Sequence, residues 1–538
     1  MTQETKNNDP FLQRAIEYWL DSSNELGYQP LFCELLTTQG YTVKYAIKST
    51  TIEQGKDVVA IDADKIPHAF QLKGGDINTK RWREEVKPEI EAMIDCPIIH
   101  PDIDKKKEHV SYLITNGEIN DAVRLEIVSL NEKKWKNSPL KYWTRGDLLN
   151  GFQQMAEGIL PSDAQSYKKL IDLIFADGEG LADIKKVSSF LYQILNIDNP
   201  KQKKAQRQRD IAAALLYANM MAGPHRKKQN YSSAVQIMVV LLSLVFHLID
   251  KYQLEDKYWI KSYEIIWNDI LRTAKLLEAE IDDNEFNKLY NSPLNTDLIP
   301  FRKYAAISII YPLKLAELII NDENWKTILN PDAGEKYKNT ITIWGEAALL
   351  PLVFLALTLR NNSATKKTSI NFIENAIDQI IVNNGRKSKH ATGLISPYYD
   401  LDFIVKLNFG LLEDKFEENF KYSSSLLKSF IEIVVRANGR EFISKKWSDI
   451  SFMRLEEFIV DKPEDLYLWR TQKGENLSIV SKKIKSWKEL TEEADSFDGK
   501  NLPTTIKRFP EFLPFFLSVF PHRANSETIG FLDINTKE

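Results

Sequence analysis

The sequence predicts an α/β domain at the N-terminus, with a mixed central sheet flanked by helices, followed by a large and mostly α-helical region. In the first part, short strand-like runs alternate with helical patterns, whereas from Ser162 onward apolar residues recur at spacings of three and four. A chain of 538 residues is also too long for one core, because domains usually hold about 100 to 200 residues. We therefore expect an α/β domain over 1–158, a helical domain over 159–440 and a mixed C-terminal region over 441–538.

The elements of the N-terminal domain follow from apolar periodicity and from turn residues. Apolar residues spaced by three and four predict helices, and short β-branched runs between Gly, Asp and Asn predict strands. The expected elements are helices over 11–20 and 30–38, strands over 41–47, 55–61 and 68–73, a helix over 80–95, a strand over 110–115 and a helix over 122–130. A closing strand and helix follow at 142–149.

The second and third strands are predicted to form a β-hairpin that carries a cluster of polar residues. Asp57 stands at the start of one apolar run, and Gln71 and Lys73 lie two apart near the end of the next. Because side chains alternate along a strand, Gln71 and Lys73 share a face while Leu72 points to the core. A carboxylate, an amide and an ammonium group that converge in this way suit metal-assisted phosphodiester hydrolysis.

This pattern also has an ordinary structural interpretation. Charged residues make up 27% of the chain, so an Asp followed by a Gln-x-Lys sequence arises easily by chance. In that interpretation Asp57 caps a turn and Lys73 is a solvated residue at the sheet edge. The order of helices and strands around the hairpin favours the functional interpretation.

Residues 1–158 resemble the PD-(D/E)XK nuclease superfamily, and within it the Mrr-like restriction endonuclease branch, in which Gln commonly replaces the last acid. The resemblance is carried by Asp57, by Gln71-Leu72-Lys73 and by the segments 113–117 and 142–149. It implies a restriction-endonuclease-like fold and a Mg²⁺ cofactor, for which Mn²⁺ can substitute. It also implies that Asp57 and Gln71 bind the metal, and that Lys73 positions or activates the attacking hydroxide.

One position departs from the pattern of that family. Its members also use an acid on the first helix, about ten residues before the glycine that ends it, and here Gln29 stands at that distance from Gly40. Glu34 is the nearest acid on the helix as predicted, and Glu25 lies one turn before Gln29. Glu34 is therefore the expected fourth catalytic residue and metal ligand, with Glu25 as the alternative.

A basic segment after the hairpin is expected to contact nucleic acid. Lys80, Arg81 and Arg83 surround Trp82 close in sequence to the predicted metal site. Lys and Arg side chains there would hold a phosphate backbone of double-stranded DNA without reading its sequence. The equal alternative is a helix start with its charges in water and Trp82 in the core. The acidic residues that follow, at 84, 85, 89 and 91, are expected to form a solvated helix face.

Composition excludes several protein classes. The net charge is −4, so any positive surface for nucleic acid must be local. Two cysteines, Cys33 and Cys96, cannot form a disulfide framework or a cysteine-rich zinc site, and they suit a reducing cytosol. The polar N-terminus has no signal-peptide pattern. We therefore expect a cytoplasmic protein.

The helical region contains two apolar segments, Ala234–Ile249 and Ile341–Leu359, which we interpret as buried helices rather than membrane spans. No GxxxxGK[ST] sequence is present, so a nucleotide-driven step would come from another polypeptide. In the C-terminal region Leu466–Trp469 has a strand-like pattern, and the aromatic segment Phe512–Pro521 could pack on its own domain or on a partner.

These features together predict a Mg²⁺-dependent DNA endonuclease. By analogy with nucleases that carry a long helical region, we expect the effector of a bacterial anti-phage or restriction system, regulated through its helical part by an ATPase or sensor subunit. The alternative is a catalytically inactive nuclease fold that serves as an interaction scaffold, and a weaker third hypothesis is a membrane-active effector. The sequence leaves open the target site, DNA or RNA, the number of metals, the activating trigger and whether the chain forms a homo-oligomer.

Overall fold

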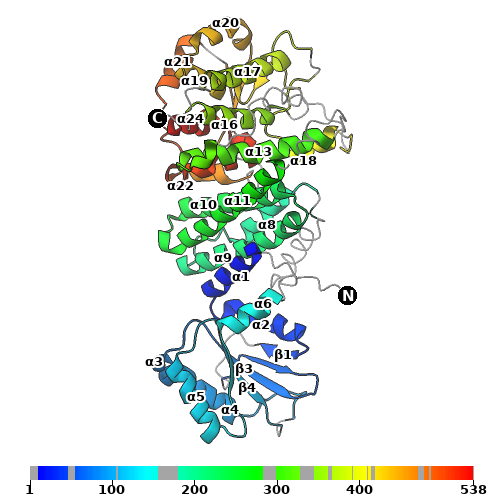
Figure 1. Cartoon of the computed structure of the whole chain (residues 1–538), viewed down its shortest axis with the longest axis vertical. Coiled ribbons are helices and arrows are strands. Elements are labelled where there is room, and N and C mark those ends of the chain that lie inside the picture. The colour runs from blue at the N-terminus through cyan, green and yellow to red at the C-terminus, as the bar shows by residue number, and fades with distance from the viewer. Residues whose placement is uncertain are drawn as a thin grey trace. The chain divides into compact units, whose positions relative to one another are not determined.

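The chain divides into two compact units, Met1–Phe175 with Lys201–Gly223 and Ala176–Pro200 with Pro224–Glu538 (Figure 1). The predicted boundary at 440 therefore falls inside the second unit. In this computed structural model the described residues are 10–46, 55–104, 107–154, 178, 180–282, 298–326, 345–361, 366–389, 392–408, 410–412, 419–469, 478–483, 486–497 and 499–536.

The first unit contains the predicted helices and strands in the predicted order. They are α1 (Pro10–Ser22), α2 (Glu25–Thr38), β1 (Thr42–Ala46), β2 (Val58–Ile61), β3 (Pro67–Lys73), α3 (Thr79–Arg81), the π-helical η1 (Trp82–Val86), α4 (Lys87–Asp95), β4 (Val110–Thr115), α5 (Asp121–Lys133), β5 (Lys141–Trp143) and α6 (Arg145–Gln154). The layout of a mixed sheet with flanking helices is confirmed.

Helix α2 begins earlier than predicted. Proline is favoured in the first turn of a helix, which placed the predicted start at Pro30. In the structure the Asn24 side chain caps the helix by accepting a hydrogen bond from the Gly27 N–H at 3.0 Å. Pro30 then lies inside α2, where its missing N–H removes one hydrogen bond of the helix. This earlier start places Glu25 and Gln29 on the helix.

The sheet has the strand order β1-β2-β3-β4-β5. Strand β2 runs antiparallel to its neighbours β1 and β3, whereas β3, β4 and β5 run parallel. Val58 pairs with Phe70 at the start of β2, and Lys73 pairs with Thr115 at the ends of β3 and β4. The beginning of β2 and the ends of β3 and β4 therefore meet at one edge of the sheet, and Asp57 immediately precedes β2 there.

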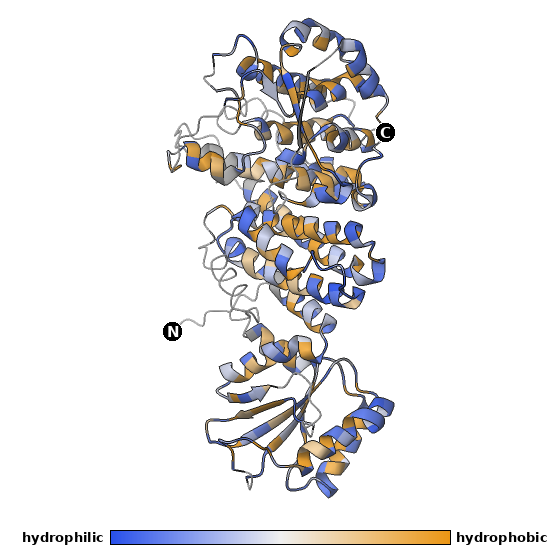
Figure 2. Cartoon of the chain, turned by 180° about the vertical axis from the view of Figure 1, so that it is seen from behind, coloured by the Kyte–Doolittle hydropathy of each residue, from blue (hydrophilic) through white to orange (hydrophobic). Residues whose placement is uncertain are grey.

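Helices cover both faces of this sheet. On one face α4, α5 and η1 pack over Val59, Ala69 and Leu113. On the other face the Phe32 ring of α2 makes an edge contact with Phe70, with 5.3 Å between the ring centroids. Figure 2 shows both hydrophobic and hydrophilic colours along the strands, yet every residue of β3 is buried. Because both faces are covered, the polar side chains of β3 are enclosed rather than open to solvent.

The second unit is mostly helical and includes one small sheet of strand order β6-β7-β8 among the described residues. Its principal elements are α8 (Ile184–Ile194), α10 (Tyr231–Tyr252), α11 (Ile260–Asp282), α13 (Leu298–Ile319), η6 (Glu346–Leu349), α16 (Leu350–Leu359), α17 (Lys366–Asn384), α18 (Leu401–Asn408), β6 (Ser423–Ser424), α19 (Leu427–Arg436), α20 (Arg440–Ile450), β7 (Arg454–Ile459), η7 (Pro463–Tyr467), β8 (Ser478–Lys483), α21 (Trp487–Asp495), α22 (Thr504–Arg508), α23 (Leu513–Val519) and α24 (Ser526–Asn535). Helix α9 (Lys204–Lys227) has residues in both units.

Two predictions for the second unit can be checked: one strand is wrong, and one aromatic segment packs within its own unit. The strand-like pattern at Leu466–Trp469 is not a strand, because 463–467 form the 3-10 helix η7, with Pro463 in its first turn. Its apolar residues are buried by helical neighbours instead of by a sheet. The aromatic segment Phe512–Pro521 packs inside its own unit, with six of the seven residues of α23 buried.

Helix α10 is long and apolar enough to cross a membrane by length and composition, and 89% of its most apolar window is buried inside the structure. All ten residues of α16 are buried as well. Within the described residues the two apolar segments are therefore core helices of the second unit, as predicted. Residues 341–344 of the second segment lie outside the described ranges.

A buried carboxylate links three elements of this unit. Glu346 begins η6 and is 1% exposed. Its Oε2 accepts hydrogen bonds from the N–H groups of Ser425 and Leu426, and its Oε1 accepts one from Asn384. Burial outweighs these bonds and raises the pKa of Glu346 from 4.5 to about 7.

We expect the second unit to lose stability as pH rises from about 5 to about 8. The folded state binds the Glu346 proton more strongly than the unfolded chain does, so its contribution is present below the unfolded pKa and is lost as pH rises through the folded pKa. The change amounts to about 3 kcal/mol. Thermal unfolding at several pH values should show a smaller loss for Glu346→Gln than for the wild type. Parallel pH profiles would contradict this assignment.

Candidate functional site

The Asp57 carboxylate lies against the strand that carries Gln71 and Lys73. The Asp57 N–H donates to the Phe70 carbonyl at 2.9 Å, which continues the β2–β3 ladder. The Asp57 Oδ2 accepts a hydrogen bond from the Leu72 N–H at 2.6 Å. That N–H belongs to the peptide that follows Gln71. Asp57 therefore does cap the end of the hairpin, and the cap itself brings the carboxylate next to the Gln-x-Lys segment.

Gln71 contributes an enclosed acceptor atom. The residue is 4% exposed, and its Oε1 has no hydrogen-bond partner among the described residues. Leaving a buried carbonyl oxygen unpaired costs about 1 to 3 kcal/mol. An amide oxygen in this position is suited to a cation or to a donor from outside the chain.

Lys73 is buried and paired, contrary to the interpretation that makes it a solvated edge residue. The residue is 6% exposed, and its Nζ lies 2.5 Å from Glu89 Oε2 and 3.3 Å from Glu85 Oε1. Burial alone would lower the pKa of the Lys73 ammonium, but the hydrogen bond and charge of Glu89, with the charge of Glu85, outweigh it and raise the pKa. The ion pairs with Glu89 and Glu85 therefore favour the charged form of Lys73.

Helix α2 contributes an amide where the resemblance places an acid. Gln29 is 6% exposed, and its Nε2 donates to the Asp57 carbonyl at 3.2 Å. Glu34 lies five residues further along α2, about 140° around the helix axis from Gln29. It is half-buried, and burial raises the pKa of its carboxyl. The structure thus brings Gln29 to Asp57, whereas Glu34 lies on another side of α2.

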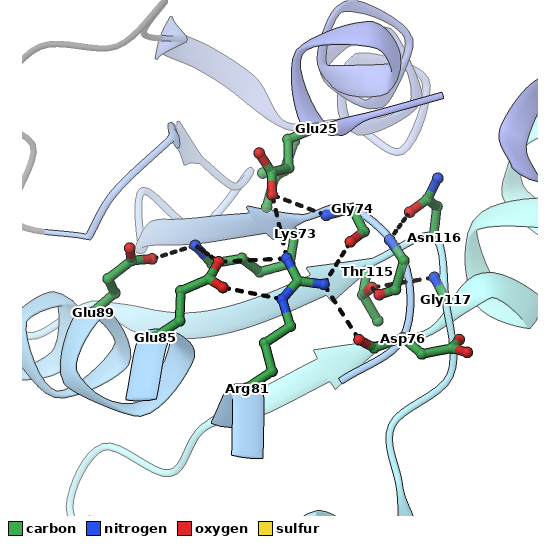
Figure 3. A network of polar contacts seen from close by, with 12 residues as sticks. Glu25, Lys73, Gly74, Asp76, Arg81, Glu85, Glu89, Thr115, Asn116 and Gly117 are labelled. Carbon is green, nitrogen blue, oxygen red and sulfur yellow. Dashed lines mark hydrogen bonds and ion pairs between the residues drawn. The ribbon is translucent and has the colours of Figure 1, made fainter. Parts of the chain in front are cut away.

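Glu25 and Arg81 hold the chain where it leaves β3 (Figure 3). The Glu25 Oε1 accepts the Gly74 N–H at 3.0 Å and lies 3.7 Å from Arg81 Nη2. The Arg81 Nη1 donates to the carbonyls of Gly74 and Asp76 at 2.6 and 3.2 Å. Its Nε and Nη2 face Glu85 at 3.2 and 3.4 Å, and this contact lowers the pKa of Glu85. Arg81 is thus engaged within the protein.

The end of β4 braces the same exit loop. The Thr115 hydroxyl donates to the Gly75 carbonyl at 2.7 Å, and the Asn116 Oδ1 accepts the Gly75 N–H at 2.7 Å. Asn116 also donates to the carbonyl groups of Leu20 and Ser23, which ties the loop to α1. Contacts from α2, α3 and the end of β4 therefore fix the loop that leaves β3.

The residues of the basic segment differ in their burial and contacts in the structure. Arg81 braces the loop as described, and Trp82 is fully buried, as the structural alternative predicts. Lys80 and Arg83 are exposed on α3 and η1. These two side chains remain available for a phosphate backbone close to the polar cluster.

Sequence reasoning missed the roles of Glu85 and Glu89, which were expected to lie in solvent. Their spacing of four residues places them on one side of a helix, and that side faces Lys73. The spacing was the available signal, but the sequence does not say which side of the helix meets the sheet. The π-helical turn over Trp82–Val86 also shifts which side chains of this helical segment face the sheet.

The donor set fits a hard divalent cation. Asp57 offers a carboxylate next to the peptide that follows Gln71, and Gln71 offers an amide oxygen. Mg²⁺ is usually held by one or two carboxylates with water and phosphate oxygens completing its shell. Within the described residues no group of three or more His, Cys, Asp or Glu side chains is arranged to hold a metal.

Comparison with known proteins finds no matching family model, no matching curated protein and no matching solved structure. The resemblance to nucleases therefore depends on the motif residues and on their placement.

Proposed function

We propose that the chain is a metal-dependent endonuclease that hydrolyses phosphodiester bonds of double-stranded DNA. The observation that carries the proposal is the 2.6 Å hydrogen bond from the Leu72 N–H to the Asp57 carboxylate. It joins the acid of one strand to the centre of the Gln71-Leu72-Lys73 segment of the next. A carboxylate, an unpaired amide oxygen and an ammonium group then lie at one sheet edge, as the proposed chemistry requires.

Each residue has a separate role in this proposal. Asp57 and Gln71 would hold Mg²⁺ or Mn²⁺, which when bound polarises the phosphate and lowers the pKa of a water molecule. Lys73 would stabilise the negative charge that develops on the phosphate, because a lysine ammonium group is charged at neutral pH. Gln29 holds the hairpin end through the Asp57 carbonyl. Lys80 and Arg83 bind the DNA backbone without reading its bases.

A plasmid cleavage assay on the full chain tests this function. Wild-type protein should nick or linearise DNA with Mg²⁺ or Mn²⁺ and stop when EDTA removes the metal. Lys73→Met should slow cleavage about 10²-fold, because it removes one charge that stabilises the transition state. Lys87→Met is the matched control, since Lys87 lies on α4 in an ion pair with Glu126 at 2.8 Å. Cleavage that Lys73→Met leaves unchanged would refute the site assignment.

The second candidate function is a catalytically inactive scaffold with a nuclease fold. Gln29 favours it, because an amide stands where the resemblance places an acid. The same assay separates the two hypotheses. A folded wild-type chain that binds DNA and never cleaves it, with either metal, supports the scaffold and contradicts the enzyme.

The wider role remains a proposal that follows from the first. An endonuclease without a regulator would damage its host, and the second unit offers a large helical body for a partner. We propose that an ATPase or sensor subunit controls cleavage in an anti-phage or restriction system. Copurification with products of neighbouring genes, followed by the cleavage assay with and without them, tests this role.

A further inference from the structure

The site as assigned has one carboxylate, that of Asp57, and α4 carries another that reaches Lys73. Gln29 stands where an acid was expected on α2, and Glu34 lies on another side of that helix. Three other carboxylates surround Lys73, those of Glu25, Glu85 and Glu89 (Figure 3). The contacts of these three carboxylates differ, and the differences identify Glu89 as the candidate ligand.

Glu25 and Glu85 already have structural roles. Glu25 accepts the Gly74 N–H, and Glu85 is held by two nitrogen atoms of Arg81. Releasing either carboxylate would loosen the loop that leaves β3. Among the described residues, the only ion-pair partner of Glu89 is Lys73, at 2.5 Å. Its side chain is 40% exposed overall, while the Oε2 atom that faces Lys73 is buried.

The backbone of α4 approaches the hairpin at Glu89. Gly55, two residues before Asp57, has φ of +73°, and a Cβ atom there would lie 2.2 Å from the Glu89 carbonyl oxygen. A glycine is therefore needed for this contact. The Glu89 backbone lies against Gly55, just before Asp57, and the Glu89 carboxylate reaches Lys73 on β3. Glu89 is therefore close to both segments that carry the proposed site.

Gln71 provides an independent sign that a ligand belongs here. Its side chain leaves β3 on the face that α4 covers, as does that of Lys73. The amide oxygen is enclosed and has no hydrogen-bond partner among the described residues. The Lys73 ammonium group is paired with Glu85 and Glu89. A divalent cation could bind the Gln71 amide oxygen and the nearby carboxylates together.

From these contacts we propose that Glu89 is a metal ligand and supplies the second carboxylate of the site, in place of an acid on α2. The inference rests on the proposed function, because it concerns the same metal. A divalent cation bound by Asp57, Gln71 and Glu89 competes with Lys73 for the Glu89 carboxylate. Binding of the cation would thus free the ammonium group for the phosphate of the substrate.

Mn²⁺ binding to the full chain, measured by isothermal titration and by electron paramagnetic resonance in the absence of DNA, tests the proposal without an activity readout. Glu89→Gln should weaken Mn²⁺ binding at least about tenfold. Glu89→Asp keeps the charge on a shorter side chain and should give an intermediate loss. Glu91→Gln is the matched control, because Glu91 lies on the same helix in an ion pair with Lys134 at 2.9 Å.

The outcomes distinguish this inference from the proposed function. If Asp57→Asn weakens Mn²⁺ binding and Glu89→Gln does not, the metal site stands and the role of Glu89 is refuted. If neither substitution weakens binding, both proposals fail. Equal losses for Glu89→Gln and Glu91→Gln would show a general effect of charge and would also overturn the assignment. Circular dichroism on each variant establishes that the first unit is folded.

Discussion

Asp57→Asn is expected to reduce metal-dependent DNA cleavage at least about 10³-fold while leaving the protein folded. The substitution removes the charge of a proposed metal ligand, and a bound metal contributes several kcal/mol to the stabilisation of the transition state. At about 1.4 kcal/mol for each tenfold change, this corresponds to three or more orders of magnitude. The asparagine oxygen can still accept the Leu72 N–H, so the hairpin end should persist.

The matched control for this prediction is Asp62→Asn, at the other end of the same hairpin. Asp62 accepts the Ile66 N–H at 2.8 Å and faces His68 at 3.0 Å, away from the proposed metal. Its substitution should leave the cleavage rate unchanged. Equal losses for the two variants, in a plasmid assay under single-turnover conditions, would argue that the hairpin matters for folding and not for chemistry.

Asp533→Asn is expected to destabilise the second unit by about 3 to 5 kcal/mol, because it leaves two buried positive charges without their partner. Asp533 on α24 is fully buried between Arg360 and Arg436. Arg360 also donates to the Asp533 carbonyl at 2.7 Å and to the Thr536 hydroxyl at 2.8 Å. The triad thus fastens the last helix to α16 and α19.

An exposed ion pair of the same unit provides the comparison. Arg440 and Asp495 lie 2.9 Å apart with side chains that are 51% and 56% exposed, and such pairs contribute at most about 1 kcal/mol. Scanning calorimetry should show a large downward shift of one transition for Asp533→Asn and little shift for Asp495→Asn. Similar shifts for the two variants would mean that the buried triad contributes no more than a surface pair.

The secondary structure of the first unit could be predicted because its patterns are local. The short apolar runs near 58–61 and 67–73 and the helical spacing over 79–95 follow from which residues must be buried. The start of α2 could not be placed, because the signal of Pro30 competed with the cap formed by Asn24. The 3-10 helix at 463–467 was missed because a short apolar run does not distinguish a strand from a buried turn.

The sequence predicted the contacts of the candidate site within the hairpin but not those between the hairpin and the helix that packs on it. The pairing of Asp57 with the Gln71-Leu72-Lys73 segment follows from strand register, which is set by local sequence. The contacts of Lys73 with Glu85 and Glu89 depend on how α4 is turned above the sheet, and that is decided by packing over the whole unit. The same packing encloses Gln71 and Lys73, whereas the structural alternative had placed Lys73 in solvent.

The burial of α10 has a consequence for how the chain is made. His247 of α10 contacts the Glu464 carbonyl at 2.7 Å, 217 residues later in the chain, and α23 also packs on α10. At about 5 to 20 residues per second, a ribosome needs about 10 to 40 s to synthesise that interval. During this time the nascent helix shows an uncovered apolar side, so the growing polypeptide should be a client of chaperones until its last hundred residues emerge.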